Sequence, residues 1–184
     1  MASPEMPTTP EPQLGRMLYA PEAIAARVAE IAAELNRRFA GRQPVVVAVL
    51  KGATVFLADL LRRLTFPLSV DFVRIASYGT GTKPGEIRFI KDVELPLEGR
   101  DVIVVDDIVD TGGTLERLKQ ALAGHRPGSI TTVALLRRAP KRRLPPTLDL
   151  IGFELESDEF VAGYGIDCAE RFRELAAIHA VSQR

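Results

Sequence analysis

Short apolar runs and stretches of helical spacing alternate along this chain. Residues 45–50 and 102–105 are apolar at every position and too short for helices, which is typical of parallel strands that are covered by helices on both faces. A helix is predicted to begin at Pro21 and to end before Gly41. Its buried face is formed by apolar residues at helical spacing, namely Ile24, Val28, Ile31 and Leu35.

The same pattern continues through the rest of the chain. Further strands are predicted at residues 70–76, 87–90, 130–136 and 150–153. Two more helices are predicted, one carrying Phe56, Leu57, Leu60, Leu61 and Leu64, the other running from Leu115 through Leu118 to Leu122 and ending near Gly124. We therefore expect an α/β fold with a doubly wound, mostly parallel central sheet that is flanked by helices.

Composition narrows the possible classes of protein. The 184 residues have a formal net charge of +0, so no global field attracts nucleic acid. No apolar stretch approaches the roughly 20 residues that span a bilayer, and no signal peptide is visible, so a soluble, cytoplasmic protein is expected. Cys168 is the only cysteine, which excludes an intrachain disulfide and a cysteine-based zinc site. Residues 1–15 are predicted to be a disordered tail, and residues 16–184 one domain.

Candidate chemistry is concentrated directly after the apolar run 102–105. Asp106, Asp107 and Asp110 follow that run and precede a helix. Two threonines and two glycines lie between these acids and the helix, namely Thr111, Gly112, Gly113 and Thr114. A surface turn with a capped helix would also fit, but adjacent carboxylates repel each other unless a cation or a diol binds them. The pattern indicates a phosphorylated ligand, held at a helix N-terminus, with hydroxyls or an oxygen-bound metal beside it.

Three other segments are candidates for function. Lys51 and Gly52 follow a buried strand, where a solvated loop is the alternative interpretation. Residues 77–85 contain three glycines and a proline after Ser77 and Tyr78, which is otherwise typical of a long hairpin connection. The basic run 137–143 lacks interleaved aromatic residues and is more typical of a solvated loop than of a nucleic-acid site.

Four motifs together resemble those of type I phosphoribosyltransferases. Residues 106–114 resemble the signature for phosphoribosyl diphosphate (PRPP), and residues 50–53 look like the loop that grips pyrophosphate. Residues 77–85 resemble the family's flexible catalytic loop. Residues 160–173 are similar to the carboxyl-terminal hood of hypoxanthine-guanine phosphoribosyltransferases. The resemblance extends from about Leu18 to Ile178, with the motifs in the family's order.

The resemblance implies a function and a set of ligands. It implies transfer of ribose 5-phosphate from PRPP to N9 of hypoxanthine, guanine or both, with Mg²⁺ as cofactor and IMP or GMP and pyrophosphate as products. It also implies a small hood, formed largely by the C-terminal segment, and a homodimer or homotetramer. Neither nucleic acid nor membrane is an expected partner. Transfer to xanthine or a pyrimidine, and an RNA-binding regulator that keeps the PRPP fold, remain alternatives.

Roles on the ribose and pyrophosphate side also follow from the resemblance. Asp106 and Asp107 would bind ribose hydroxyls, directly or through Mg²⁺, and residues 111–114 would hold the 5-phosphate. The pyrophosphate would be bound by Lys51, Gly52 and Arg173, with Asp167 as a second Mg²⁺ ligand. The Leu50–Lys51 peptide is expected to be cis by the same resemblance.

On the base side, Asp110 would take a proton from the purine ring, Phe160 would stack on it and Val161 would contact it through its backbone. Arg138 stands where the hypoxanthine-guanine enzymes have a lysine that donates to the 6-oxo group, and Arg137 is the alternative donor. Ser77 and Tyr78 would belong to the loop that closes over the site and excludes water.

Overall fold

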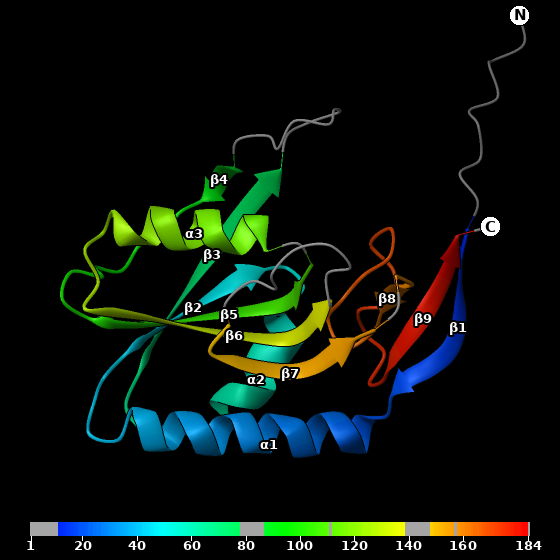
Figure 1. Ribbon diagram of the computed structural model, residues 1–184, viewed down its shortest axis with the longest axis horizontal. Coiled ribbons are helices and arrows are strands. Elements are labelled where there is room, and N and C mark those ends of the chain that lie inside the picture. Colours follow the sequence, from blue (N-terminus) through cyan, green and yellow to red (C-terminus); the bar gives the residue numbers. More distant parts are fainter. Residues whose placement is uncertain (1–10, 78–86, 111, 139–147, 157, 184) are drawn as a thin grey trace, which may run out of the picture.

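Two sheets organise the chain, as a computed structural model shows for residues 11–77, 87–110, 112–138, 148–156 and 158–183 (Figure 1). The larger sheet has the strand order β4-β3-β2-β5-β6-β7 and the smaller one the order β1-β9-β8. The larger sheet consists of β2 (Val45–Leu50), β3 (Ser69–Ser77), β4 (Ile87–Lys91), β5 (Asp101–Val109), β6 (Ser129–Arg138) and β7 (Leu150–Leu155). The smaller sheet consists of β1 (Pro12–Tyr19), β8 (Phe160–Ala162) and β9 (Ile178–Gln183).

Helices cover both faces of the larger sheet. Figure 1 shows α1 (Pro21–Arg38) and α2 (Thr54–Leu61) on one side and α3 (Gly113–Ala123) on the other. Alternate residues of one strand therefore enter different cores: Ile103 and Val105 pack in the cluster with α1 and α2, whereas Val102 and Val104 pack with α3. This explains why residues 102–105 are apolar at every position. No helix in the described ranges is long and apolar enough to cross a membrane.

The strand order places a topological switch point between β2 and β5. These two strands are parallel neighbours, paired through Ala48 and Val105 at the end of their register. From β2 the chain crosses through α2 to β3, whereas from β5 it crosses through α3 to β6 on the opposite face. Ligands of open α/β sheets bind at such a switch point, beyond the carboxyl ends of the strands. The predicted doubly wound, mostly parallel sheet is confirmed, with β4 antiparallel to β3 as its single reversed edge among the described strands.

Two strand ends differ from the prediction. Strand β5 continues to Val109, so Asp106 and Asp107 lie within the paired strand and not after it. Strand β6 likewise continues through Arg137 and Arg138, which the sequence placed in a basic loop. In both cases the strand continues past its apolar residues because polar residues also pair with a neighbouring strand through their backbone. A hydropathy pattern does not predict such backbone pairing.

The smaller sheet and residues 163–177, which connect β8 to β9, form what we call the hood, and this sheet contains both ends of the described chain. Strand β9 pairs with β1 on one side and β8 on the other, both antiparallel. Residues 12–15, predicted as part of a disordered tail, are therefore strand residues, and the hood includes an N-terminal strand besides the C-terminal segment. Residues 1–10 of that predicted tail lie outside the described ranges. In Figure 1 the hood lies beyond the arrowheads of β5, β6 and β7.

Candidate active site

Two adjacent carboxylates, Asp106 and Asp107, lie near the end of β5, the strand that pairs with β2 at the switch point. Asp106 is only 8% exposed, and burial raises the pKa of its carboxyl well above the usual range, an effect that the neighbouring Asp107 carboxylate increases. Burial also raises the pKa of Asp107, while hydrogen bonding to Asp106 and the charge of Arg173 act in the opposite direction. Such a pair is stabilised when a cation or hydroxyl donors bind to it.

The turn after β2 lies directly against this pair. A Cβ atom added at Gly52 would come within 1.6 Å of Asp107 Oδ2, so only glycine fits while that carboxylate keeps its position. The hood approaches from the other side, because a Cβ at Gly165 would lie 2.4 Å from the Gly52 carbonyl oxygen. The Leu50–Lys51 peptide that leads into the turn is cis, as expected.

The N-terminus of α3 follows the β5 carboxylates. Gly112 precedes the helix with φ of 77°, and its carbonyl accepts the first helical hydrogen bond, from the Glu116 amide at 2.9 Å. Gly113 and Thr114 begin the helix and are exposed, so the first-turn amides are open to an anion. Thr111 lies outside the described ranges.

Charged side chains of the hood meet Lys51. Its Nζ lies 3.1 Å and 3.0 Å from the two carboxylate oxygens of Glu170. Arg173 Nη2 lies 2.7 Å from Asp167 Oδ1 and 3.3 Å from Glu170 Oε2. The hydrogen bonds from Lys51 and Arg173 hold the pKa of Glu170 below its usual range. The structure thus brings together three residues that the sequence assigned to pyrophosphate and Mg²⁺, namely Lys51, Asp167 and Arg173.

A second ion pair lies on the β6 side of the site. Arg138 Nε is 3.3 Å from Asp110 Oδ1, and Arg138 Nη2 donates to the Glu159 carbonyl oxygen at 3.1 Å. Asp110 is exposed, whereas the Arg138 side chain is only 15% exposed. Phe160, which directly follows Glu159, is 60% exposed. Arg138 therefore contacts both Asp110, the predicted proton acceptor, and Glu159, which directly precedes the predicted stacking residue Phe160.

Val161 and Arg137, the other two residues considered for the base side, do not take part in the Arg138–Asp110 ion pair. Val161 is 5% exposed and pairs with Ala180 across the hood sheet. Arg137 forms an ion pair with Glu154, and its Nε is buried without a hydrogen-bond partner among the described residues. Arg138, and not Arg137, is thus the arginine that contacts Asp110.

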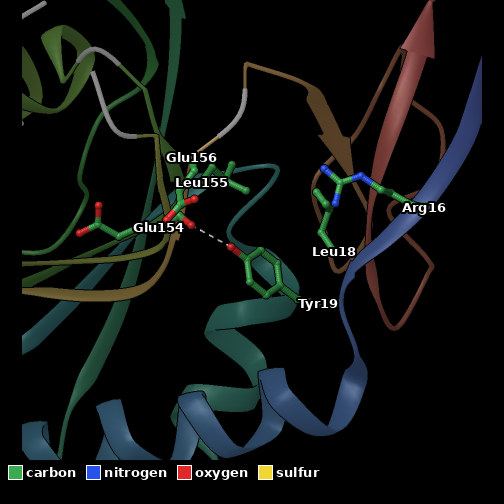
Figure 2. A pocket seen from close by; sticks show the side chains of 6 residues that line it. All are labelled: Arg16, Leu18, Tyr19, Glu154, Leu155 and Glu156. Atoms are coloured by element: carbon green, nitrogen blue, oxygen red, sulfur yellow. Dashed lines mark hydrogen bonds between the residues drawn. The ribbon is translucent and has the colours of Figure 1, made fainter. Parts of the chain in front are cut away.

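A pocket of about 480 Å³ separates the hood from the end of β7 (Figure 2). It is lined by Arg16, Leu18, Tyr19, Glu154, Leu155 and Glu156. The Tyr19 hydroxyl donates to the Glu154 carbonyl oxygen at 2.9 Å, and its ring stacks on Phe153 with centroids 4.2 Å apart. None of the residues predicted to bind ligands lines this pocket. It lies where β1 meets the end of β7 in the larger sheet.

The loop and metal predictions are tested only in part. Ser77 ends β3, and Tyr78 with the rest of the predicted loop, residues 79–85, lies outside the described ranges. Within those ranges no group of three or more His, Cys, Asp and Glu side chains could by itself hold a metal. Mg²⁺ commonly takes only one or two carboxylates and completes its octahedron with phosphate oxygens and water, so the Asp106–Asp107 pair and Asp167 fit that ion.

Sequence reasoning missed some of the contacts that shape the site. The sequence assigns Glu170 no role beyond its place in residues 160–173, yet it contacts Lys51 and Arg173, the two predicted pyrophosphate cations. The approach of Gly165 to Gly52 was also missed, and so was the hydrogen bond from the Tyr164 hydroxyl to Asp59 Oδ2 at 2.5 Å, which ties the hood to α2. The Glu170–Lys51, Gly165–Gly52 and Tyr164–Asp59 contacts each join residues more than 100 positions apart, and local spacing contains no signal for such pairs.

Comparison with known proteins gives consistent similarities. The family of the phosphoribosyl transferase domain matches residues 15–169. The hypoxanthine-guanine phosphoribosyltransferase of Bacillus subtilis (strain 168) is 39% identical over 164 residues, which cover 89% of this chain and 91% of that protein. The bifunctional protein TilS/HprT of Listeria monocytogenes serotype 4b is 41% identical over 164 residues, but this chain spans only 25% of its length. A crystal structure of a hypoxanthine-guanine phosphoribosyltransferase from Bacillus anthracis superposes with a TM-score of 0.86 and 37% identity, covering 94% of this chain and 100% of that one.

Proposed function

The chain belongs to the phosphoribosyl transferase family, and from that premise we propose that it transfers ribose 5-phosphate from PRPP to N9 of hypoxanthine or guanine. It is a purine salvage enzyme, and its products are IMP or GMP and pyrophosphate. One observation carries the proposal: the Asp106–Asp107 pair lies on β5 at its switch point with β2, the α3 N-terminus follows it in the chain, and the cations Lys51 and Arg173 contact Glu170 beside it. PRPP carries its ribose hydroxyls between the 5-phosphate and the pyrophosphate group. This matches a carboxylate pair that lies between a helix N-terminus and two cations.

The reaction breaks the C1′–oxygen bond to pyrophosphate and forms a bond from C1′ to N9. Because positive charge develops on the ribose ring as pyrophosphate leaves, the site must neutralise the leaving group and exclude water. Lys51 and Arg173, with the amide of Gly52, bind the pyrophosphate. Residues 111–114 hold the 5-phosphate at the helix N-terminus, so both ends of PRPP are fixed while the bond breaks.

Mg²⁺ would be held by Asp106 and Asp107 on the ribose side and by Asp167 on the pyrophosphate side. When bound, it supplies positive charge that stabilises the departing pyrophosphate. Gly52 keeps Asp107 in place for this task, since any side chain there would displace the carboxylate.

The base binds between the hood and the end of β6. Phe160 offers an exposed ring for stacking, Val161 contacts the base through its backbone, and Arg138 donates to the 6-oxo group. Asp110 accepts the proton that the purine ring loses, and Arg138 Nε at 3.3 Å keeps its carboxylate oriented. The loop that begins at Ser77 and Tyr78 closes over the ligands, and the protein assembles as a homodimer or homotetramer.

A substrate assay tests this function. Purified protein with PRPP and Mg²⁺ should form IMP from hypoxanthine or GMP from guanine, together with one pyrophosphate per nucleotide. Xanthine and pyrimidine bases serve as the competing substrates. Product from xanthine or a pyrimidine alone would replace the proposal by one of the alternatives, and no product from any base would overturn it.

Asp110→Asn tests the assignment of the proton acceptor. Asparagine keeps the size of the side chain but is not basic, so kcat should fall by roughly 10²- to 10⁴-fold while PRPP affinity changes little. Asp107→Asn is the matched comparison, and it should weaken PRPP binding and raise the magnesium requirement. PRPP titration and turnover, measured on both variants, separate the two roles. Near-wild-type kcat in Asp110→Asn would overturn this assignment and leave Asp110 only as the ion-pair partner of Arg138.

A further inference from the structure

An internal carboxylate contacts both cations that are proposed to bind pyrophosphate. Glu170 receives Lys51 Nζ on its two oxygens, at 3.1 Å and 3.0 Å, and Arg173 Nη2 on Oε2 at 3.3 Å. Two donors from separate segments thus converge on one anion, as they would on a phosphate group. We propose that the Glu170 carboxylate occupies the pyrophosphate position of the ligand-free enzyme and competes with pyrophosphate for Lys51 and Arg173. This inference rests on the proposed function.

The backbone holds Glu170 in this position. Ala169 and Glu170 both have positive φ values, 53° and 61°, within a turn closed by hydrogen bonds between Cys168 and Arg171 at 3.2 Å and 3.1 Å. The Glu170 amide also donates to Asp167 Oδ2 at 2.9 Å. Non-glycine residues seldom adopt such φ values, so the turn is a specific arrangement that aims Glu170 at Lys51.

Exchange of Glu170 for pyrophosphate needs no change in the backbone. Arg173 is fixed independently, because its Nη1 donates to the Gly165 carbonyl oxygen at 2.8 Å and its Nη2 contacts Asp167. The Lys51 and Glu170 side chains are 51% and 66% exposed, so their contact is a weak surface ion pair. Pyrophosphate carries more negative charge than one carboxylate and displaces Glu170 by rotation of a single exposed side chain.

This competition has a consequence for the reaction. Each ligand that carries pyrophosphate must displace Glu170, which lowers its affinity, and the returning carboxylate favours release of the pyrophosphate product. The nucleotide product lacks the pyrophosphate group, so its affinity does not depend on Glu170. Glu170 therefore lowers the affinity of the site for ligands that carry pyrophosphate and leaves its affinity for the nucleotide product unchanged.

Calorimetric titration of the full chain with pyrophosphate and magnesium chloride tests the inference. Glu170→Gln keeps the shape and removes the charge, so pyrophosphate and PRPP should bind about twofold to fivefold more tightly. Affinity for IMP should stay at the wild-type value. Glu174→Gln, an exposed neighbour outside these contacts, makes the same change in net charge and should bind pyrophosphate as the wild type does.

A thermodynamic cycle with Lys51→Met identifies the contact responsible. If Glu170 acts through Lys51, its substitution should increase pyrophosphate affinity less in the Lys51→Met background than in the wild type. Unchanged or weaker binding by Glu170→Gln, or an equal gain in Glu174→Gln or for IMP, overturns the inference. Those results leave the proposed function standing as long as the wild type binds PRPP. A wild type that binds neither PRPP nor pyrophosphate overturns the proposed function and this inference with it.

Discussion

At the scale of single residues, the site depends on close approach of the backbone. The turn after β2 lies against the Asp107 carboxylate on one side, and Gly165 of the hood lies against the Gly52 carbonyl on the other. Gly165 has φ of +95°, so a side chain there would be strained as well as crowded. Ligand groups can therefore reach backbone amides at the turn, which a side chain at residue 52 would prevent.

Gly52→Ala should impair PRPP binding more than stability. Its Cβ would meet the end of the Asp107 side chain, which can rotate away, so we expect a free energy of unfolding within about 1 kcal/mol of the wild type. The displaced carboxylate should lower PRPP affinity by about tenfold or more, as loss of one charge-assisted contact does. Gly152→Ala is the comparison, because its Cβ would lie 2.2 Å from the Leu135 carbonyl oxygen, a backbone atom, and should mainly destabilise the fold. Urea unfolding measures the stability of both variants, and titration measures their PRPP affinity. If Gly52→Ala lowered stability as much as it lowered PRPP affinity, the prediction would be contradicted.

Arg138 should be needed for the base and not for PRPP. Arg138→Ala removes a cationic donor that contacts Asp110, so the KM for hypoxanthine should rise by about 10- to 100-fold while the KM for PRPP changes far less. Arg138→Lys keeps the charge and should retain use of 6-oxopurines. Steady-state kinetics with each substrate varied in turn measures both. If Arg138→Ala raises both KM values equally, recognition of the base belongs to Arg137 or to the backbone.

At the scale of elements, a buried carboxylate fixes the connection between β4 and β5. Asp71 of β3 is 5% exposed and accepts hydrogen bonds from the amides of Phe72, Glu94 and Leu95, at 2.7 Å, 2.7 Å and 2.8 Å, with Lys91 Nζ at 3.3 Å. Burial raises the pKa of Asp71, but these donors lower it more, so the net pKa lies below the ordinary value of 3.8. Backbone amides of the connection thus bind this buried carboxylate, in addition to the packing of the Leu97 side chain in the core.

Asp71→Asn should destabilise the protein in a pH-dependent way. At pH 7 the variant should lose about 1 to 3 kcal/mol of unfolding free energy, because the amide donors lose a charged acceptor. The folded-state pKa is depressed, so the stabilisation is present above the unfolded pKa and is lost as the pH falls through the folded pKa. The difference from the wild type should therefore narrow below about pH 4. Urea unfolding across this range measures it, with Glu98→Gln as an exposed control, and a difference that is constant with pH would contradict the account.

How far the sequence predicts the fold also becomes clear at the scale of elements. The α1 helix and strands β2 and β5 follow from spacing because each is packed against the core over its length. Strand β1 was missed because five of its eight residues are exposed, so they carry no alternating apolar pattern, and its order comes from pairing with β9. The site motifs were recognisable because they are contiguous. Glu170 and the Gly52–Gly165 contact were not, since they depend on how the hood meets the larger sheet.

At the scale of the whole molecule, the hood connects the two ends of the described chain to the site. Strand β9 lies between β1 and β8, and β8 begins with the exposed Phe160. Arg16 of β1 forms an ion pair with Glu159, whose carbonyl oxygen accepts a hydrogen bond from Arg138. The N-terminal strand is therefore joined to the proposed base side of the site, while the proposed PRPP side is built from β2, β5 and α3.

Truncation of β1 should separate these two sides. Deletion of residues 1–10 keeps the whole of β1, so both KM values should match the wild type. Deletion of residues 1–17 removes most of the partner of β9, and the lost order of β8 should raise the KM for the base by about tenfold, equivalent to ~1.4 kcal/mol, with a smaller change for PRPP. Arg16→Ala in the full chain removes only an exposed ion pair and should have little effect. If the longer deletion binds hypoxanthine as tightly as the wild type, β8 and β9 position Phe160 without β1, and the N-terminal strand has no part in base binding.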